Sequence, residues 1–290
     1  MLRPLDVALV SCAVLPEHDP DEAPLTEALR ADGLRVETLA WDDPTADFSR
    51  ARAAVIRSTW NYPTAPEAFA AFVDRTAGVT ALYNRARTVH WNLHKRYLLD
   101  LERAGVPVVP TRVVPRGDRT TLQTCMDSLG TTRAVVKPAI SGASRGTLRV
   151  DPGDVERGEE HLRALTSIED ALVQPYLPSV EGYGERACVW IDGEVTHAVR
   201  KSPRFAGGVE SVSSAVDVAD DELALARDAL AVAPGPLLFA RIDVARGDDD
   251  RPMIMELELI EPSLFLGQSP RALARFVAAI RRRLEATESP

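Results

Sequence analysis

The chain has 290 residues, 45% of them hydrophobic and 27% charged, which is enough for two or three packed units. Its 34 basic and 43 acidic side chains give a net charge of -9, which argues against non-specific binding to nucleic acid or to an anionic membrane. The three cysteines are far apart, and no apolar run approaches the roughly 20 residues of a membrane helix. We therefore expect a cytoplasmic protein with no disulfide framework, no cysteine-based zinc site and no membrane segment.

The first part of the chain alternates between predicted strands and helices. Apolar runs predict strands over residues 5–12, 36–41, 53–57 and 80–83, and helical spacing predicts helices over residues 24–32 and 67–76. This β-α-β-β-α-β order predicts an open α/β domain over residues 1–88. Ligands of such sheets bind at the carboxyl ends of strands, so the loop over residues 57–62 is a candidate binding segment.

The middle of the chain predicts a helix over residues 92–104 and then a smaller unit of strands and helices. Its expected strands cover residues 108–111, 133–138, 147–150 and 171–177, and its expected helices cover residues 122–129 and 156–165. Beyond it, the turn at Asp192-Gly193 predicts a hairpin of residues 185–191 and 194–200. Helices are expected over residues 220–231 and 270–285.

Two predicted strands between those last helices carry charged side chains in alternation. Arg241 and Asp243 share one face of the first strand, and Glu256 and Glu258 share one face of the second. Burying ionised acids on core strands costs free energy unless they are paired or bind a metal. A Mg²⁺ site facing a nucleotide would offset that cost. A solvated polar face of an antiparallel pair is the alternative at this point.

The glycine-rich run Gly142-Ala143-Ser144-Arg145-Gly146 allows two interpretations. As G-x-S-x-G it would be a hydrolase nucleophile elbow at Ser144, but that motif needs a helix directly afterwards, and residues 147–150 are β-prone. The other interpretation is a hairpin loop whose backbone N–H groups cover phosphates. Lys137 ends the strand before this loop and Lys95 lies near a helix start; each is either a phosphate ligand or a surface lysine.

Taken in order, these motifs resemble the ATP-grasp superfamily of carboxylate–amine ligases, and the resemblance covers essentially the whole chain. It implies an α/β chain with the ATP-grasp fold: an N-terminal α/β domain (1–88), a linker helix with a lid subdomain (89–178) and a C-terminal catalytic subdomain with the metal site (179–290). It also implies ATP and Mg²⁺ as cofactors, with two ions expected and Mn²⁺ as a substitute.

The resemblance further implies residue roles. Phosphate contacts are expected from Lys95, Lys137, Ser141, Gly142, Ala143 and Ser144, and adenine contacts from Gln174, Pro175, Tyr176 and Leu177. Glu185, with Glu181 as its rival, would bind the ribose. Asp243, Glu256 and Glu258 would hold the metal ions, although many members carry Asn at the position of Glu258. Arg241 would stabilise the transferring phosphoryl group, and Arg200, Lys201 and Arg204 would contact phosphate or substrate.

A narrower similarity points to the small ATP-grasp group that includes the D-cycloserine-forming cyclo-ligase. It is carried by Arg57-Ser58-Thr59-Trp60-Asn61-Tyr62, by Gly184-Glu185, by residues 197–201 and by residues 256–263. The expected activity is ATP-dependent C–N ligation of a small amino-acid-like carboxylate, within one molecule or between two. Residues 57–62 and Lys201 are the expected substrate contacts. A non-catalytic nucleotide-binding module and a serine hydrolase at Ser144 are the alternatives, and a homodimer is left open.

Overall fold

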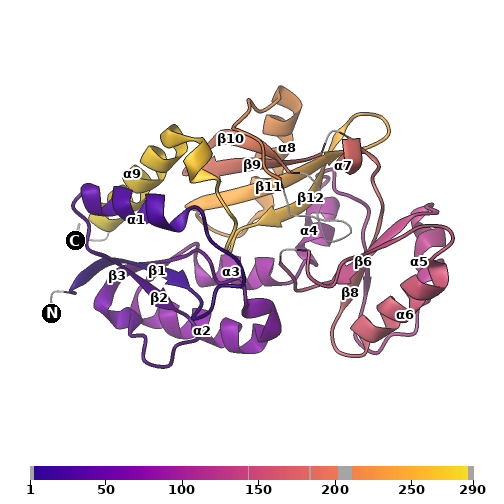
Figure 1. The fold of residues 1–290 in the computed structure, drawn as a ribbon, viewed down its shortest axis with the longest axis horizontal. Helices are drawn as coiled ribbons and strands as arrows, with labels where there is room; N and C mark the ends of the chain where they lie inside the picture. The colour runs from indigo at the N-terminus through magenta and orange to yellow at the C-terminus, as the bar shows by residue number, and fades with distance from the viewer. Residues whose placement is uncertain (1–2, 143, 183, 202–210, 287–290) are drawn as a thin grey trace.

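The computed structural model describes residues 3–142, 144–182, 184–201 and 211–286, and it contains three four-stranded sheets (Figure 1). The N-terminal sheet is parallel, in the order β2-β1-β3-β4. Its elements are β1 (Leu5–Ser11), α1 (Glu22–Ala31), β2 (Val36–Ala40), β3 (Ala51–Ile56), α2 (Pro66–Val79) and β4 (Ala81–Tyr83). The predicted open α/β unit is confirmed.

The long helix predicted over residues 92–104 is wrong, because two helices replace it: α3 (Ala86–Leu93) and α4 (Tyr97–Arg103). Between them His94 is extended, and the backbone N–H of Lys95 donates to Ala139 O at 2.9 Å instead of to a carbonyl of α3. The break turns the buried Lys95 side chain toward the loop at Ser141. A helix running straight through this segment would carry that lysine elsewhere.

The second unit, which we call the lid, is an antiparallel sheet in the order β5-β8-β6-β7 with α5 and α6 packed on it. Its elements are β5 (Arg112–Val114), α5 (Leu122–Leu129), β6 (Ala134–Pro138), β7 (Leu148–Val150), α6 (Val155–Thr166) and β8 (Ala171–Pro175). The strand expected at residues 108–111 starts later; Val108 makes only an isolated bridge to Ile254. A separate apolar core, including Leu122, Met126 and Leu162, fills the lid.

The third sheet is antiparallel, in the order β10-β9-β11-β12. Its elements are the short helix α7 (Ser179–Gly182), β9 (Glu185–Ile191), β10 (Glu194–Lys201), α8 (Asp220–Val232), β11 (Phe239–Arg246), β12 (Pro252–Glu258) and α9 (Pro270–Ala286). The register pairs Arg241 with Glu258 and Asp243 with Glu256, so the four charged residues form one patch across two strands. The predicted sharing of faces is therefore confirmed.

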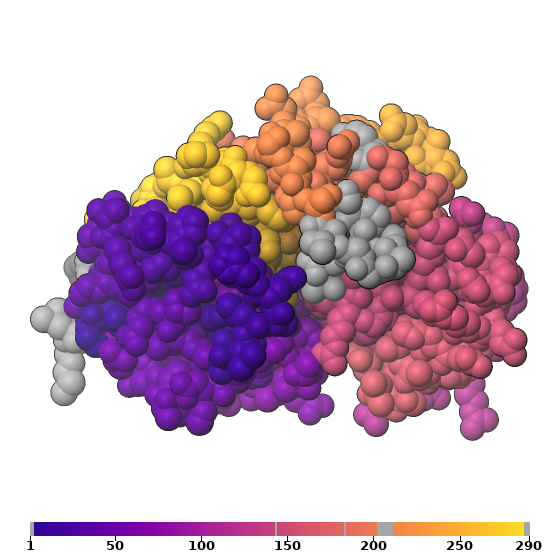
Figure 2. Space-filling view, viewed as in Figure 1, coloured from indigo at the N-terminus to yellow at the C-terminus, as the bar shows by residue number. Residues whose placement is uncertain are grey.

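The first and third sheets share one hydrophobic core, whereas the lid projects from them as a separate lobe (Figures 1 and 2). Helix α9 lies beside α1, and Arg281 Nε donates to Asp32 Oδ2 at 2.6 Å. Asn84 donates to Phe239 O and to Leu259 O, both at 2.9 Å. No helix in the described ranges is long and apolar enough to cross a membrane.

Candidate functional site

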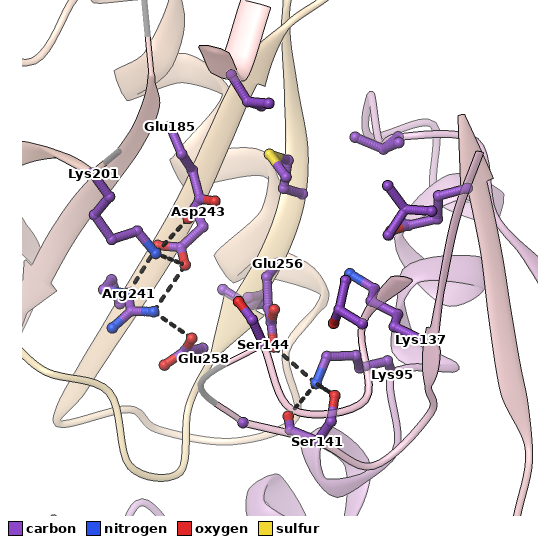
Figure 3. A pocket seen from close by; sticks show the side chains of 18 of the residues that line it. Lys95, Lys137, Ser141, Ser144, Glu185, Lys201, Arg241, Asp243, Glu256 and Glu258 are labelled. Carbon is purple, nitrogen blue, oxygen red and sulfur yellow. Dashed lines mark hydrogen bonds and ion pairs between the residues drawn. The ribbon is translucent and has the colours of Figure 1, made fainter. Parts of the chain in front are cut away.

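A cavity of about 1020 Å³ lies where the three sheets meet. Its lining comes from the segments that the motifs singled out and from the N-terminal unit (Figure 3). The lining residues from the predicted set are Trp60, Tyr62, Lys95, Lys137, Ser141, Gly142, Ser144, Gln174, Pro175, Tyr176, Leu177, Glu185, Lys201, Arg241, Asp243, Glu256 and Glu258. Side chains separated by up to about two hundred positions in the sequence thus share one cavity.

The patch on β11 and β12 forms a tight charged network on one side of this cavity (Figure 3). Arg241 donates from Nε to Asp243 Oδ1 at 2.8 Å and from Nη2 to Asp243 Oδ2 at 2.9 Å. It also donates to Glu258. Two hydrogen bonds to one carboxylate fix the guanidinium in place, which suits a group that meets a developing charge.

Lys201 joins this network from β10. Its Nζ lies 2.7 Å from Asp243 Oδ2 and is also paired with Glu185. The β9–β10 register sets Lys201 opposite Glu185, so the hairpin itself delivers both groups to the cavity. Among the described residues, this lysine is the only cation besides Arg241 that pairs with Asp243.

The acids of the network differ in how readily they ionise. Burial alone would raise the pKa of Asp243, but Arg241 and Lys201 outweigh it and hold that pKa well below its usual range. Burial raises the pKa of Glu258 to about 8, and the nearby charges of Asp243 and Glu256 add to the effect. Burial likewise raises the pKa of Glu185 to about 7, against the pull of Lys201. Glu185 and Glu258 therefore stay partly protonated near neutral pH, whereas Asp243 is ionised.

Glu256 lies between this network and the side chains of Lys95 and Lys137 (Figure 3). Lys95 Nζ lies 3.0 Å from Glu256 Oε1 and donates to the carbonyl oxygen of Ser141. Burial would raise the pKa of Glu256, but the two ammonium groups hold it below its usual range. Burial lowers the pKa of Lys137, which Glu256 partly offsets. Two cations facing one acid form a site suited to an anionic group such as a phosphate.

The oxygen donors of Asp243, Glu256 and Glu258 fit a hard cation such as Mg²⁺. In this structure each of the three acids is paired with a lysine or an arginine. The described residues contain no group of three or more acids, histidines or cysteines already arranged around one ion. Metal binding would therefore require some of these ion pairs to open.

The glycine-rich loop is followed by strand β7, not by a helix. Ser144 has a φ of 58° and Gly146 a φ of 69°, as in a tight turn. His161 Nε2 bonds to Gly146 O at 2.8 Å and His197 Nδ1 to Thr196 Oγ1 at 2.9 Å, and within the described ranges neither histidine hydrogen bonds to Ser144. This geometry contradicts a hydrolase elbow at Ser144. Ala143 lies outside the described residues.

The hinge after β8 lines the cavity at its lid end. Gln174 Nε2 donates to Thr111 Oγ1 at 2.9 Å, which fixes the side chain within the lid. The guanidinium carbon of Arg149 lies 4.2 Å from the centre of the Tyr176 ring and closes this end of the cavity. Glu181 is paired with Arg149 and does not line the cavity, in contrast to Glu185.

Several predicted substrate contacts lie away from the cavity. Ser58 and Thr59 are buried, and Asn61 bonds to Trp41 and Asp42 on the surface of the N-terminal unit. The residues of the predicted set that are absent from the lining are Arg57, Ser58, Thr59, Asn61, Glu181 and Arg200. Arg200 is exposed on the face of β10 opposite Lys201, because neighbours in a strand point to opposite faces. Arg204 lies outside the described residues.

Arg57 has a structural environment instead. It donates from Nη2 to Pro262 O at 2.9 Å and lies 3.7 Å from Asp21. The rings of Phe239 and Phe276 lie 5.3 and 5.9 Å from its guanidinium carbon. Arg57 thus joins the N-terminal unit to the segment after β12.

The sequence reasoning assigned no role to Glu261, which the structure places in the cavity wall. Its carboxyl group lies close to the buried Tyr62 hydroxyl. Burial raises the pKa of Glu261 to about 7, and Glu256 adds to the effect. The only available signal was its position three residues after Glu258, and the alternation of a strand does not extend into that irregular segment.

Known proteins are similar to this chain over nearly its whole length. The family model described as D-cycloserine synthetase DcsG, N-terminal domain, matches residues 7–84. The cycloserine biosynthesis protein DcsG of Streptomyces lavendulae is 36% identical over 296 aligned residues, covering 96% of this chain and 99% of that protein. This chain belongs to the D-cycloserine synthetase family.

Solved structures agree with the family assignment. The crystal structure of D-cycloserine synthetase DcsG superposes with a TM-score of 0.89 at 36% identity, covering 96% of this chain and 99% of that one. The ATP-grasp ligase PsnB, solved with its minimal precursor, Mg and ADP, gives a TM-score of 0.66 at 19% identity over 96% and 97% of the two chains. The chain therefore has the ATP-grasp fold, and as a D-cycloserine synthetase family member it is an ATP-dependent ligase that forms C–N bonds.

Proposed function

We propose that this chain is an ADP-forming cyclo-ligase that activates the carboxylate of a small amino-acid-like substrate and closes a ring through a nitrogen of the same molecule. The observation that carries the proposal is the cavity itself. It sets Arg241, Lys137 and Lys95 beside the acids of β11 and β12 in one cavity. The name of the Streptomyces lavendulae relative supports a cyclic amino-acid product.

The chemistry explains why such a site needs so many charges. A carboxylate is a poor acyl donor because its leaving group would be oxide, whereas an acyl phosphate releases phosphate. Negative charge builds up in the transition states of phosphoryl transfer and of the attack by nitrogen, and lysine, arginine and metal ions stabilise it. No side-chain nucleophile is needed, which is consistent with the absence of a serine–histidine pair among the described residues.

We assign the nucleotide side as follows. Lys95, Lys137 and the backbone of Ser141 and Gly142 hold the phosphates, and the hinge over residues 174–177 holds the adenine. Glu185 is the better candidate for the ribose because it lines the cavity, whereas Glu181 is paired with Arg149 and does not line it.

Asp243, Glu256 and Glu258 would hold Mg²⁺, two ions being our proposal, with Mn²⁺ as a substitute. When bound, the metal neutralises phosphate charge. Burial raises the pKa of Glu258 to about 8, and a bound cation would stabilise its ionised form. Arg241 is bonded to both Asp243 and Glu258, so it is positioned at the border between metal ligands and the transferring group.

Water must be kept away from an acyl phosphate. The lid carries Lys137 and the loop at Ser141 on a sheet with its own core, so we propose that the lid closes over the bound nucleotide as one body. Trp60 and Tyr62 would form the substrate end of the closed site.

The test is substrate-dependent ADP release with Mg²⁺ across small amino acids, amino-acid pairs and ureido-amino acids such as O-ureido-D-serine, with product masses. A product built from one substrate molecule supports ring closure. A product that joins two substrates would overturn the cyclo-ligase assignment and leave a peptide-type ligase. ATP binding without any ADP release across the panel would favour a nucleotide-binding module instead.

A further inference from the structure

Glu261 lies where three segments of the chain meet. The indole Nε1 of Trp60 donates to Glu261 O at 3.0 Å and thereby fixes its backbone. The Tyr62 hydroxyl lies close to its carboxyl group. From the lid side, a Cβ built on Gly142 would lie 3.9 Å from Glu261 Oε1, so the loop backbone passes directly against this carboxyl group.

The charge around Glu261 distinguishes it from the other inner acids of the cavity. Glu185, Asp243, Glu256 and Glu258 each form an ion pair within 4.0 Å. Among the residues that the structure describes, Glu261 forms none. Lys95 is near enough to lower the pKa of Glu261, but it is already paired with Glu256 and hydrogen bonded to Ser141.

The position of Tyr62 also indicates that the partner of the Glu261 carboxyl group is a ligand and not another side chain of the protein. Burial keeps the pKa of Tyr62 well above its ordinary value, so its hydroxyl stays protonated beside Glu261. A neutral phenol orients a carboxylate without neutralising it. Glu261 lines the cavity, and a carboxylate there that pairs with no cation of the described residues favours a positively charged group of a ligand.

We propose that Glu261, oriented by Tyr62, binds the α-ammonium group of an amino-acid substrate. This inference rests on the proposed function. The carboxylate to be activated must lie beside Asp243, Glu256 and Glu258, and in an α-amino acid the ammonium group is attached one carbon away. Glu261 follows Glu258 by three residues and both line the cavity, so the two acids can serve different groups of one small substrate. Glu261 is thus a substrate-selecting residue that recognises a free primary ammonium.

The loop at Gly142 adds a size limit to this charge preference. Because the loop already approaches the Glu261 carboxyl group closely, an acyl group on the substrate nitrogen would collide with the loop as well as remove the positive charge. We therefore expect strong rejection of N-acylated substrates.

The experiment compares O-ureido-D-serine with its Nα-acetyl derivative, using ADP release by the wild type and by Glu261→Gln. The carboxamide keeps the shape of the side chain and can accept from Tyr62, but it carries no charge. We expect kcat/KM for the free amino acid to fall about 100-fold, mainly through KM, because truncating one side of a buried charge pair costs a few kcal/mol. Turnover of the acetyl derivative should be equally poor in both enzymes, and thermal stabilisation by Mg·ADP should be unchanged.

Two further variants complete the test. Tyr62→Phe should show the same substrate-selective loss, about tenfold, since it removes the hydroxyl beside the carboxylate. Glu37→Gln is the matched control, because Glu37 pairs with Arg50 on the surface away from the cavity, and it should behave as the wild type. The inference would be overturned if Glu261→Gln and Tyr62→Phe lost activity equally on both substrates. It would also be overturned if Glu261→Gln retained kcat/KM within twofold of the wild type. A wild type that releases no ADP with any substrate would instead overturn the proposed function, and the inference with it.

Discussion

Replacing Arg57 with Met tests whether this residue is a structural tie or a substrate ligand. Its side chain is 5% exposed and that of Asp21 is 1% exposed, so the substitution leaves a buried carboxylate without its cation. Asp21 keeps hydrogen bonds from Leu264 N and Leu266 N at 2.6 and 2.7 Å, which hold it in place. The variant also loses the bond from Arg57 to Pro262 O.

The magnitude follows from these contacts. Breaking one side of a buried ion pair costs about 3–5 kcal/mol. We expect the lower end, about 3 kcal/mol, because Nε and Nη1 of Arg57 have no hydrogen-bond partner and their removal relieves a penalty. With an unfolding entropy of about 0.6 kcal/mol/K for a chain of this length, the melting temperature should fall by about 5 °C.

Thermal and urea unfolding of Arg57→Met, Asp21→Asn and the double variant measure this effect. The double variant should recover part of the loss, because it removes the uncompensated charge as well as the guanidinium. The KM for the amino-acid substrate should stay within twofold of the wild type. A normally stable Arg57→Met with a KM raised tenfold or more would refute the reasoning and restore Arg57 as a substrate ligand.

Three further results are expected. Glu256→Gln and Lys137→Ala should each lower ADP release by about 10²–10³-fold or more while keeping the circular dichroism of the wild type, and normal turnover in either would remove that residue from the active site. Burial raises the pKa of Glu258 to about 8 from an ordinary 4.5, so the folded state retains a proton that the unfolded chain has lost. This group therefore lowers stability as the pH rises from about 5 to 8, and Glu258→Gln should show a shallower fall in urea-unfolding free energy than the wild type; equal slopes would contradict it. Gly158→Ala should destabilise the lid by about 1–3 kcal/mol because its Cβ would lie 2.5 Å from a leucine methyl, whereas Gly153→Ala, with nothing within 4 Å, serves as the control in limited proteolysis.

Local periodicity predicted the parts of this molecule that depend on neighbours in the sequence. The alternation that sets Arg241 and Asp243 on one face, and Glu256 and Glu258 on another, holds because a strand has a period of two. The parallel N-terminal sheet follows from alternating strands and helices in the same way.

Other features depend on contacts that no local pattern records. The break before α4 exists because the N–H of Lys95 finds a carbonyl at Ala139, forty-four positions away. The burial of Arg57 depends on Asp21 and on Pro262, two segments that only the folded chain brings together. Glu261 is in an irregular segment whose backbone is held by Trp60 from the loop after β3.

The core shared by β1, α1, β11 and α9 has a consequence for biosynthesis on the ribosome. Val7 and Leu25 cannot be fully covered until Phe276 and Ile280 have left the exit tunnel, because these residues belong to one cluster. The lid, by contrast, contains all of its own core within residues 114–173 and can pack while translation continues. A nascent chain would thus hold a finished lid beside an unfinished N-terminal sheet, and chaperones that bind exposed apolar strands should recognise that sheet until α9 emerges.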